Sequence, residues 1–254
     1  MYPVLFHIGS FAVRSYDVMV LLGMIAGLSL GCYRARRAGL DGGKVVAGGV
    51  GIILVSLAGS RLGNVIIDLG RYVSNWRAIF SLYGTGFQGG LLAGVLATLA
   101  LARYLRVSFW RLADLFAPGL VLGQAIGRVG CFLNGCCYGR PTDSFLGVYL
   151  PGWGVGWAYR YPTQFMHTTA NLLILVVLLR VDRRRPFEGF TFLLYALLYS
   201  TQRLLIDFLR ETGPLIGSLR ATEVVSVATI LVAAVVLGWK WACARSNLFK
   251  CRSN

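Results

Sequence analysis

Charged residues are scarce in this sequence, and their scarcity excludes an ordinary soluble domain. Only 14% of the 254 residues are Asp, Glu, Lys or Arg, whereas 56% are hydrophobic. Soluble globular domains contain about 25% charged residues. The sequence also lacks internal repeats and low-complexity segments. We therefore predict a polytopic membrane protein that forms a single integral-membrane domain over residues 1–254.

Seven apolar segments have the length of about 17 to 25 residues that a membrane-spanning helix requires. The predicted spans are residues 17–33, 45–67, 85–101, 112–131, 163–179, 187–209 and 221–243. The 32 glycines fit closely packed membrane helices, because small residues let helix backbones approach each other. The predicted fold class is all-α, with about seven transmembrane helices.

The positions of the basic residues predict the topology and exclude a nucleic-acid partner, despite a formal net charge of +15. Fifteen lie in the first, third and fifth connections and the tail: Arg34, Arg36, Arg37, Lys44, Arg103, Arg106, Arg111, Arg180, Arg183, Arg184, Arg185, Lys240, Arg245, Lys250 and Arg252. Seven lie on the opposite side: Arg14, Arg71, Arg77, Arg140, Arg160, Arg210 and Arg220. The positive-inside rule then predicts an outside N-terminus and a cytoplasmic C-terminus.

The N-terminus lacks a basic segment ahead of an apolar core and a small-residue cleavage pattern, so we expect no removable signal peptide. The outer connection over residues 132–162 is too short for a separate folded domain. We expect it to form a short arm or a re-entrant cap. Its aromatic residues Tyr149, Trp153, Trp157 and Tyr159 suit the membrane interface.

The six cysteines do not establish a disulfide framework. Cys32, Cys243 and Cys251 are expected on the reducing cytoplasmic side, whereas Cys131, Cys136 and Cys137 are expected near the outer face, where oxidation is possible. The adjacent pair at positions 136 and 137 does not readily supply the spaced ligands of a tetrahedral zinc site, and no second ligand pair follows. We expect neither a metal nor a cofactor.

With this topology, the membrane-embedded polar residues of note all fall in the outer half of the membrane. They are Tyr16, Arg61, Asn64, Asp68, Gln88, Arg128, Asn134, His167, Arg203 and Asp207. Guanidinium groups make paired, charge-assisted hydrogen bonds to phosphate. Three embedded arginines with only ten acidic residues in the whole chain therefore predict a cavity for an anionic head group.

Simpler roles remain open for the same residues. Arg61 can pair with Asp68 or Asp207, and Arg203 can pair with Asp207 four residues further along the same helix. Asn134 can be a turn residue that satisfies its own backbone.

The run from Gly127 to Gly135, GRVGCFLNG, resembles the signature Gly-Arg-x-Gly-Asn-Phe-x-Asn-Gly-Glu of bacterial prolipoprotein diacylglyceryl transferases. Four further runs resemble motifs of this family in the same order, and together they extend the resemblance from Arg14 to Glu211. These runs are VRSY at residues 13–16, GSRLG at 59–63, RYPTQ at 160–164 and the stretch 199–210.

The resemblance implies an enzyme of the bacterial inner membrane with seven spans and an outside N-terminus. It implies transfer of the diacylglyceryl group of phosphatidylglycerol to the lipobox cysteine of preprolipoproteins, with release of glycerol phosphate. Arg128 and Arg203 would hold the phosphate and stabilise the leaving group. The residues that would form the rest of the substrate site are Tyr16, Arg61, Gly89, Gly90, Cys131, Asn134, Gly139, Tyr199 and Asp207.

The chain departs from the family pattern at several positions. Gln88 stands where the family has a histidine, and glutamine cannot accept a proton at neutral pH. Cys131 and Cys136 replace the first asparagine and the glutamate of the signature. We predict that His167 supplies the proton chemistry that Gln88 cannot, although it can instead hydrogen-bond a carbonyl or Asn171. A thiol of pKa about 8.5 is partly ionised at neutral pH, so a strong base is not essential.

Three functions follow from these observations. The main prediction is a monomeric diacylglyceryl transferase of the inner membrane, whose partners are phosphatidylglycerol, lipobox peptides and membrane lipids. The second is a divergent relative that uses another phospholipid or acceptor. The third is a lipid-binding or transport protein that retains the arginine pocket without the chemistry.

Overall fold

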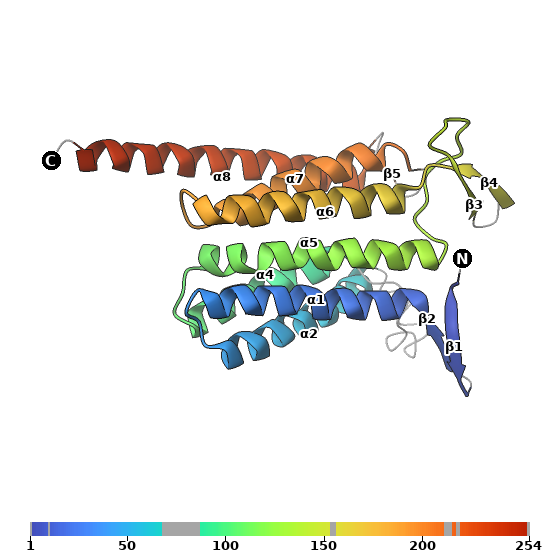
Figure 1. Ribbon diagram of the computed structural model, residues 1–254, viewed down its shortest axis with the longest axis horizontal. Helices are drawn as coiled ribbons and strands as arrows, with labels where there is room; N and C mark the ends of the chain where they lie inside the picture. The colour runs from blue at the N-terminus through green and yellow to red at the C-terminus, as the bar shows by residue number, and fades with distance from the viewer. Residues whose placement is uncertain are drawn as a thin grey trace. The chain divides into compact units, whose positions relative to one another are not determined.

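The computed structural model describes residues 2–9, 11–67, 87–152, 156–210, 215–216 and 219–252, which are mostly helical (Figure 1). The long helices are α1 (Ser15–Arg37), α2 (Gly42–Ile67), α4 (Phe87–Tyr104), α5 (Phe109–Leu133), α6 (Thr163–Val181), α7 (Phe190–Asp207) and α8 (Ala221–Arg252). Each of the seven segments predicted from the sequence overlaps one of these helices over most of its length.

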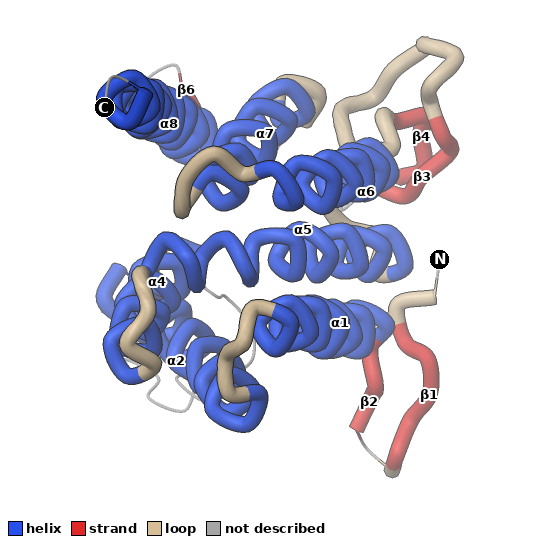
Figure 2. Tube along the Cα trace, turned by 60° about the vertical axis from the view of Figure 1, so that its left-hand side comes forward, coloured by secondary structure: helices blue, strands red, loops and turns tan. Residues whose placement is uncertain are grey.

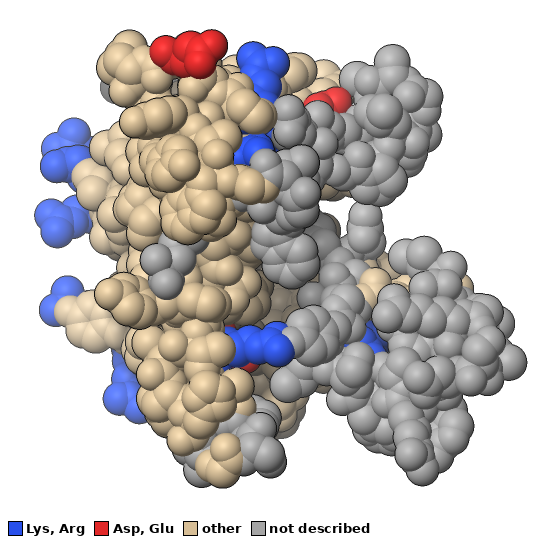
Figure 3. Space-filling model, turned by 90° about the vertical axis from the view of Figure 1, so that its right-hand side faces the viewer, with Lys and Arg blue, Asp and Glu red and all other residues tan. Residues whose placement is uncertain are grey.

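Five helical segments among the described residues are long and apolar enough to cross a membrane: Ser15–Arg37, Gly42–Ile66, Phe109–Leu133, Thr163–Arg184 and Thr222–Arg245. The chain is therefore a multi-pass membrane protein. The segment Gly89–Tyr104 is a shorter apolar helix. Membrane crossing by α4 and α7 stays a prediction. Uncharged side chains cover much of the face shown in Figure 3, on which basic side chains predominate among the charged ones.

The chain forms two compact units. The first comprises residues Met1–Ser29 and Ala117–Asn254, and the second comprises Leu30–Phe116. The boundaries fall inside α1 and α5, so each of these helices contributes to both units. That the whole chain is one domain stays a prediction.

The core of the first unit lies where α5, α6 and α7 meet. Ala117 and Val121 of α5 pack against Ile174 and Leu178 of α6 and Tyr195 of α7. The amide of Gln124 donates to the Tyr195 hydroxyl at 2.8 Å, which satisfies a polar group inside this apolar cluster. Helix α7 packs against both α6 and α8 (Figure 2).

Glycines let α1 and α5 come into backbone contact within the first unit. A Cβ atom built on Gly27 would lie 2.5 Å from the carbonyl oxygen of Gly119, and one on Gly23 would lie 2.7 Å from that of Gly123. No larger residue fits such a crossing without moving a backbone. Small residues at matching positions are a common means of close packing between membrane helices.

The second unit is built on a similar contact between α2 and α4. A Cβ on Gly63 would lie 3.0 Å from the Cα of Gly89, and one on Gly90 would lie 3.1 Å from the carbonyl oxygen of Ser56. At one end of the unit, Leu101 and Ala102 of α4 pack with Leu112 of α5.

A buried arginine donates to backbone carbonyls that precede the proline inside α5. Arg34 of α1 is 9% exposed and donates to the carbonyl oxygens of Asp114 and Leu115, both at 2.8 Å. Pro118 lies four residues after Asp114 inside α5 and has no N–H to offer that carbonyl. Arg34, which the sequence placed in a loop, therefore supplies a hydrogen bond that the helix lacks.

Small antiparallel hairpins accompany the helices. Strands β1 (Val4–Ile8) and β2 (Phe11–Arg14) precede α1, and β5 (Leu215–Ile216) pairs with β6 (Leu219–Arg220) before α8. In the connection between α5 and α6, β3 (Val148–Gly152) pairs with β4 (Gly156–Arg160). The predicted short arm is thus a hairpin with exposed aromatic rings: Tyr149 stacks on Trp157 with their centroids 5.4 Å apart. Trp153 lies outside the described residues.

Candidate functional site

The predicted site residues of the first unit gather where α5 ends, α6 begins and α7 ends. Arg128 lies in the last two turns of α5 and is half-buried. His167 interacts electrostatically with three arginines, which are Arg128, Arg203 and Arg210. Arg128 and the three outer cysteines lie within reach of Tyr16, which opens α1. Four segments that are distant in sequence, namely the starts of α1 and α6 and the ends of α5 and α7, therefore meet at one place in this unit.

Arg128 differs from the other embedded arginines. Among the described residues it has neither a hydrogen-bond acceptor nor an acidic partner. A cation at this depth of a membrane helix is unfavourable unless an anion or water accompanies it. The position therefore suits an external anion.

Arg203 and Arg210 share the carboxylate of Asp207. Arg203 Nε lies 3.7 Å from Asp207 Oδ2, and Arg210 Nη1 lies 3.4 Å from Asp207 Oδ1. The pairing of Arg203 with Asp207 that the sequence left open is confirmed. Among the described residues of this group, one buried carboxylate accompanies three arginines, which leaves an excess of positive charge.

His167 is fully buried and is oriented by two side chains. Its Nδ1 lies 3.3 Å from Oε1 of Gln202, whose Nε2 donates to Oδ1 of Asn171 at 3.1 Å. In this arrangement Nδ1 carries the hydrogen and Nε2 keeps a lone pair. Nε2 has no partner among the described residues. Asn171 thus reaches His167 through Gln202 and does not bond it directly.

The chain after α5 is fixed by a helix C-terminal motif. Cys136 N–H donates to Cys131 O at 3.0 Å, and Gly135 N–H donates to Phe132 O at 3.1 Å, which together form a Schellman motif. Gly135 has φ +70°, the left-handed conformation that this motif requires and that glycine adopts at no steric cost. Asn134, at the end of the helix, donates its backbone N–H to Gly130 O at 3.0 Å, and both predicted roles of its side chain stay predictions.

The start of α6 holds the same loop in place. The hydroxyl of Thr163 donates to Cys137 O at 2.6 Å, and Nε2 of Gln164 donates to Cys136 O at 2.8 Å. Both side chains are buried. The RYPTQ run therefore positions the loop between α5 and α6.

Two predicted site residues have clear packing roles. A Cβ on Gly139 would lie 2.7 Å from the carbonyl oxygen of Leu209, so only glycine fits between that backbone and Tyr161. Tyr199 stacks on Tyr195 with ring centroids 5.6 Å apart and packs against the core. Contact of either residue with a lipid head group stays a prediction.

Arg61, Gly89 and Gly90 belong to the second unit, whereas Arg128 belongs to the first. The two glycines pack against α2. The side chain of Gln88 lies outside the described residues, as does Asp68. The predicted contributions of Arg61, Gln88, Gly89 and Gly90 to the site therefore stay predictions.

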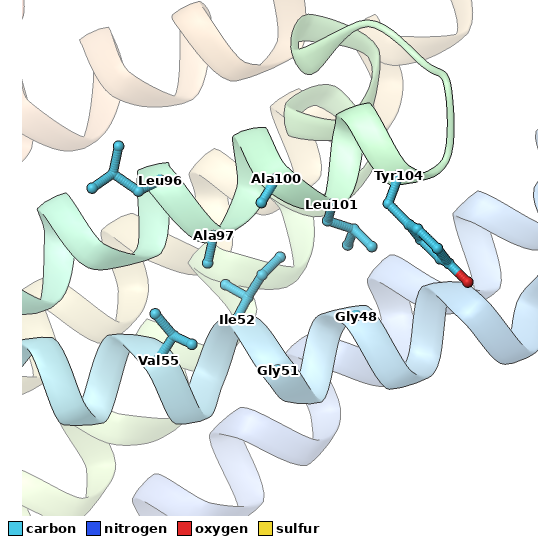
Figure 4. Close-up of a pocket in the computed structure, with 9 residues that line it drawn as sticks. All are labelled: Gly48, Gly51, Ile52, Val55, Leu96, Ala97, Ala100, Leu101 and Tyr104. Carbon is cyan, nitrogen blue, oxygen red and sulfur yellow. The ribbon is translucent and has the colours of Figure 1, made fainter.

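A groove of about 490 Å³ between α2 and α4 is not a candidate for phosphate binding (Figure 4). Its walls are glycines and apolar side chains from Gly48 to Leu101, with Tyr104 at one end. It offers no cation to an anionic ligand and is suited to lipid chains.

Sequence reasoning missed several residues that build the site. Gln202 orients His167, Thr163 and Gln164 hold the loop, and Arg210 shares Asp207 with Arg203. All four lie in the motif runs 160–164 and 199–210, so the resemblance to the family already pointed to these stretches of the sequence.

Known proteins resemble this chain over most of its length. A model of the family described as prolipoprotein diacylglyceryl transferase matches residues 3–239. The chain belongs to this family. Proteins named phosphatidylglycerol–prolipoprotein diacylglyceryl transferase are similar over most of their length. That of Acaryochloris marina is 33% identical over 96% of this chain and 92% of its own, and that of Gloeobacter violaceus is 34% identical over 93% and 92%.

A further relative has a similar identity. The protein of the same name from Clostridium botulinum is 31% identical over 91% of this chain and 94% of its own. As a member of the diacylglyceryl transferase family, the chain has cysteines at positions 131 and 136, where the signature quoted above has asparagine and glutamate.

Proposed function

We propose that the chain transfers the diacylglyceryl group of phosphatidylglycerol to the lipobox cysteine thiol of preprolipoproteins. We further propose that it acts as a monomer in the bacterial inner membrane, with seven spans, an outside N-terminus and a cytoplasmic C-terminus. Family membership and the names of the relatives support the reaction. The observation that supports it most directly is Arg128, half-buried in a membrane helix with no protein anion among the described residues.

The reaction replaces a carbon–oxygen bond by a carbon–sulfur bond. The lipobox sulfur attacks the glyceryl carbon that carries the phosphate, and the phosphate oxygen leaves with the electron pair as glycerol phosphate. Negative charge therefore grows on the phosphate in the transition state. A fixed guanidinium next to that oxygen stabilises the transition state more than the substrate, which lowers the barrier.

The arginines have different tasks in this proposal. Arg128 is the phosphate clamp. The charges of Arg203 and Arg210 are partly offset by Asp207, which holds both guanidinium groups near the end of α7. They supply positive potential for the leaving group. Asp207 keeps them from pairing directly with the phosphate of the bound substrate before the reaction.

His167 is proposed to accept the thiol proton. Its Nε2 has a lone pair without a described partner, and Gln202 fixes the ring from the other side. The proton then passes to the released phosphate or to water, which balances the reaction. Because His167 is completely buried, the cysteine of the acceptor peptide has to enter the site to reach this side chain.

The test is transfer in defined liposomes. Purified protein is given phosphatidylglycerol labelled in its acyl chains together with a lipobox peptide, and a peptide with serine in place of cysteine is the control. We expect label on the cysteine peptide alone, with one equivalent of glycerol phosphate released. Transfer to another acceptor would indicate a divergent relative. Lipid binding without any turnover would contradict the proposal.

A further inference from the structure

Three cysteines outside the arginine and histidine roles come together at the end of α5. The sulfur atoms of Cys131, Cys136 and Cys137 all lie within 4.8 Å of one another. All three are free thiols. Cys131 is 8% exposed and the other two are half-buried. The described part of the chain contains no other such group of His, Cys, Asp and Glu side chains.

The helix terminus explains why residues spaced in this way meet. In a Schellman motif the side chain three positions before the helix cap contacts the side chain two positions after it. These two positions are Cys131 and Cys136, and Cys136 Sγ lies 3.6 Å from Cys131 O. The sequence spacing of the cysteines alone disfavoured a metal site, because it does not show that the chain turns back at the Schellman motif.

A left-handed residue then brings in the third sulfur. Cys137 has φ +63°, a conformation that residues other than glycine adopt infrequently and at some cost. The buried side chains of Thr163 and Gln164 hold the carbonyls of Cys137 and Cys136. The three thiols are therefore kept together by the backbone before any ligand binds.

The spacing of the sulfurs suits one soft metal ion. A metal–sulfur bond of about 2.3 Å places three sulfurs around one ion roughly 4 Å apart. Small side-chain rotations bring the present cluster to that size. Thiolates select Cu(I) and Zn(II) over harder cations. Arg210 and Arg128 lie within electrostatic reach of Cys137, so their charges offset the negative charge of a three-thiolate complex.

We propose that Cys131, Cys136 and Cys137 form a binding site for one thiophilic metal ion held by three thiolates. Cu(I) would be three-coordinate there, whereas Zn(II) would keep a fourth position for water or another ligand. The binding releases the thiol protons and involves no oxidant. The proposal does not depend on the transferase activity.

The test measures bound metal on the full-length protein in detergent. Reduced, metal-free protein is given Zn(II) or Cu(I) in separate arms, and bound ions are counted by mass spectrometry after removal of the excess. We expect one ion per chain in at least one arm. Cys131→Ser, Cys136→Ser and Cys137→Ser should each weaken binding by about 100-fold or more, because loss of a ligand costs more than a change in its surroundings. Cys243→Ser, at an exposed thiol of α8, is the matched control and should bind as the unmodified protein does.

X-ray absorption of the loaded, unmodified protein gives an independent measurement, which remains valid if a serine variant fails to fold. We expect three sulfur neighbours at about 2.3 Å from the metal. Absence of stoichiometric binding in both arms would overturn the proposal. So would equal binding by the three variants, or a reduced protein that binds no metal while the air-exposed protein forms a disulfide within the trio.

Discussion

At Arg128 the side chain ends in a half-buried guanidinium for which the described part of the chain supplies no anion. Arg203 has a carboxylate 3.7 Å away. Two arginines that look alike in the sequence therefore differ in what they can bind. The difference arises because α7 carries an acid one turn after its arginine, whereas α5 carries glycines around its own.

The first prediction concerns Arg128. Arg128→Ala should abolish lipid transfer, and Arg128→Lys should leave only weak activity, because an ammonium cannot present paired donors in a plane. A charged hydrogen bond contributes roughly 1.5 to 3 kcal/mol, or about one to two decades in rate or affinity. Initial rates of labelled-lipid transfer give the measurement. Arg180→Ala, at an exposed arginine of α6, is the matched control. Full activity in Arg128→Ala would contradict the proposal that Arg128 holds the phosphate.

The second prediction separates the role of His167 from that of Gln88. His167→Ala should lose transfer, and adding Gln88→His should restore part of it, because either imidazole can accept the thiol proton. Initial rates of labelled-lipid transfer by the single and double variants give the measurement. His7→Ala, at an exposed residue of β1, should have no effect. Undiminished transfer by His167→Ala alone would end the proposal for this residue.

At the scale of helices, glycine contacts determine how closely α1 and α5 approach each other. The contact of Gly27 with Gly119 leaves no room for a methyl group, whereas Gly238 of α8 has open space around it. The same substitution at these two positions should therefore have opposite effects on stability.

The third prediction is the matched pair Gly27→Ala and Gly238→Ala. Forcing an extra methyl group into a packed contact costs about 1 to 3 kcal/mol. In an open helix position, alanine instead stabilises by roughly 0.5 to 1 kcal/mol relative to glycine. Thermal unfolding in detergent should thus show a lower midpoint for Gly27→Ala and an equal or higher midpoint for Gly238→Ala. Equal midpoints for both would mean that the helix contact does not limit stability.

At the scale of the whole molecule, the fifteen to seven division of basic residues sets the fourth prediction. Reporter fusions after Arg37, Arg106 and Arg185 should report the cytoplasm, and fusions after Asn75 and Gly152 should report the outside. The opposite result at two or more sites would invert the topology and place Arg128 at the cytoplasmic face.

Much of this architecture was predictable because membrane helices are long and apolar. Each predicted span overlaps a helix, and the pairing of Arg203 with Asp207 followed from helical spacing. The hairpins were not predicted as strands, since runs of two to five residues have no periodicity strong enough to read. The bond from Gln202 to His167 joins two helices, and local spacing does not reveal which faces meet. The cysteine cluster depends on the Schellman motif at the end of α5, which the spacing of the cysteines in the sequence does not reveal.

The bond between Arg34 and the Asp114 carbonyl also constrains the order in which the chain can change. If Arg34 is lost first, the Asp114 carbonyl loses the hydrogen bond from its guanidinium, and Pro118 has no N–H to replace it. If Pro118 is first replaced by a residue with an N–H, α5 can close its own bond and Arg34 becomes replaceable. The order of the two substitutions therefore matters. Replacement of Pro118 followed by loss of Arg34 keeps the carbonyl bonded at each step, whereas loss of Arg34 first passes through an intermediate that lacks this hydrogen bond.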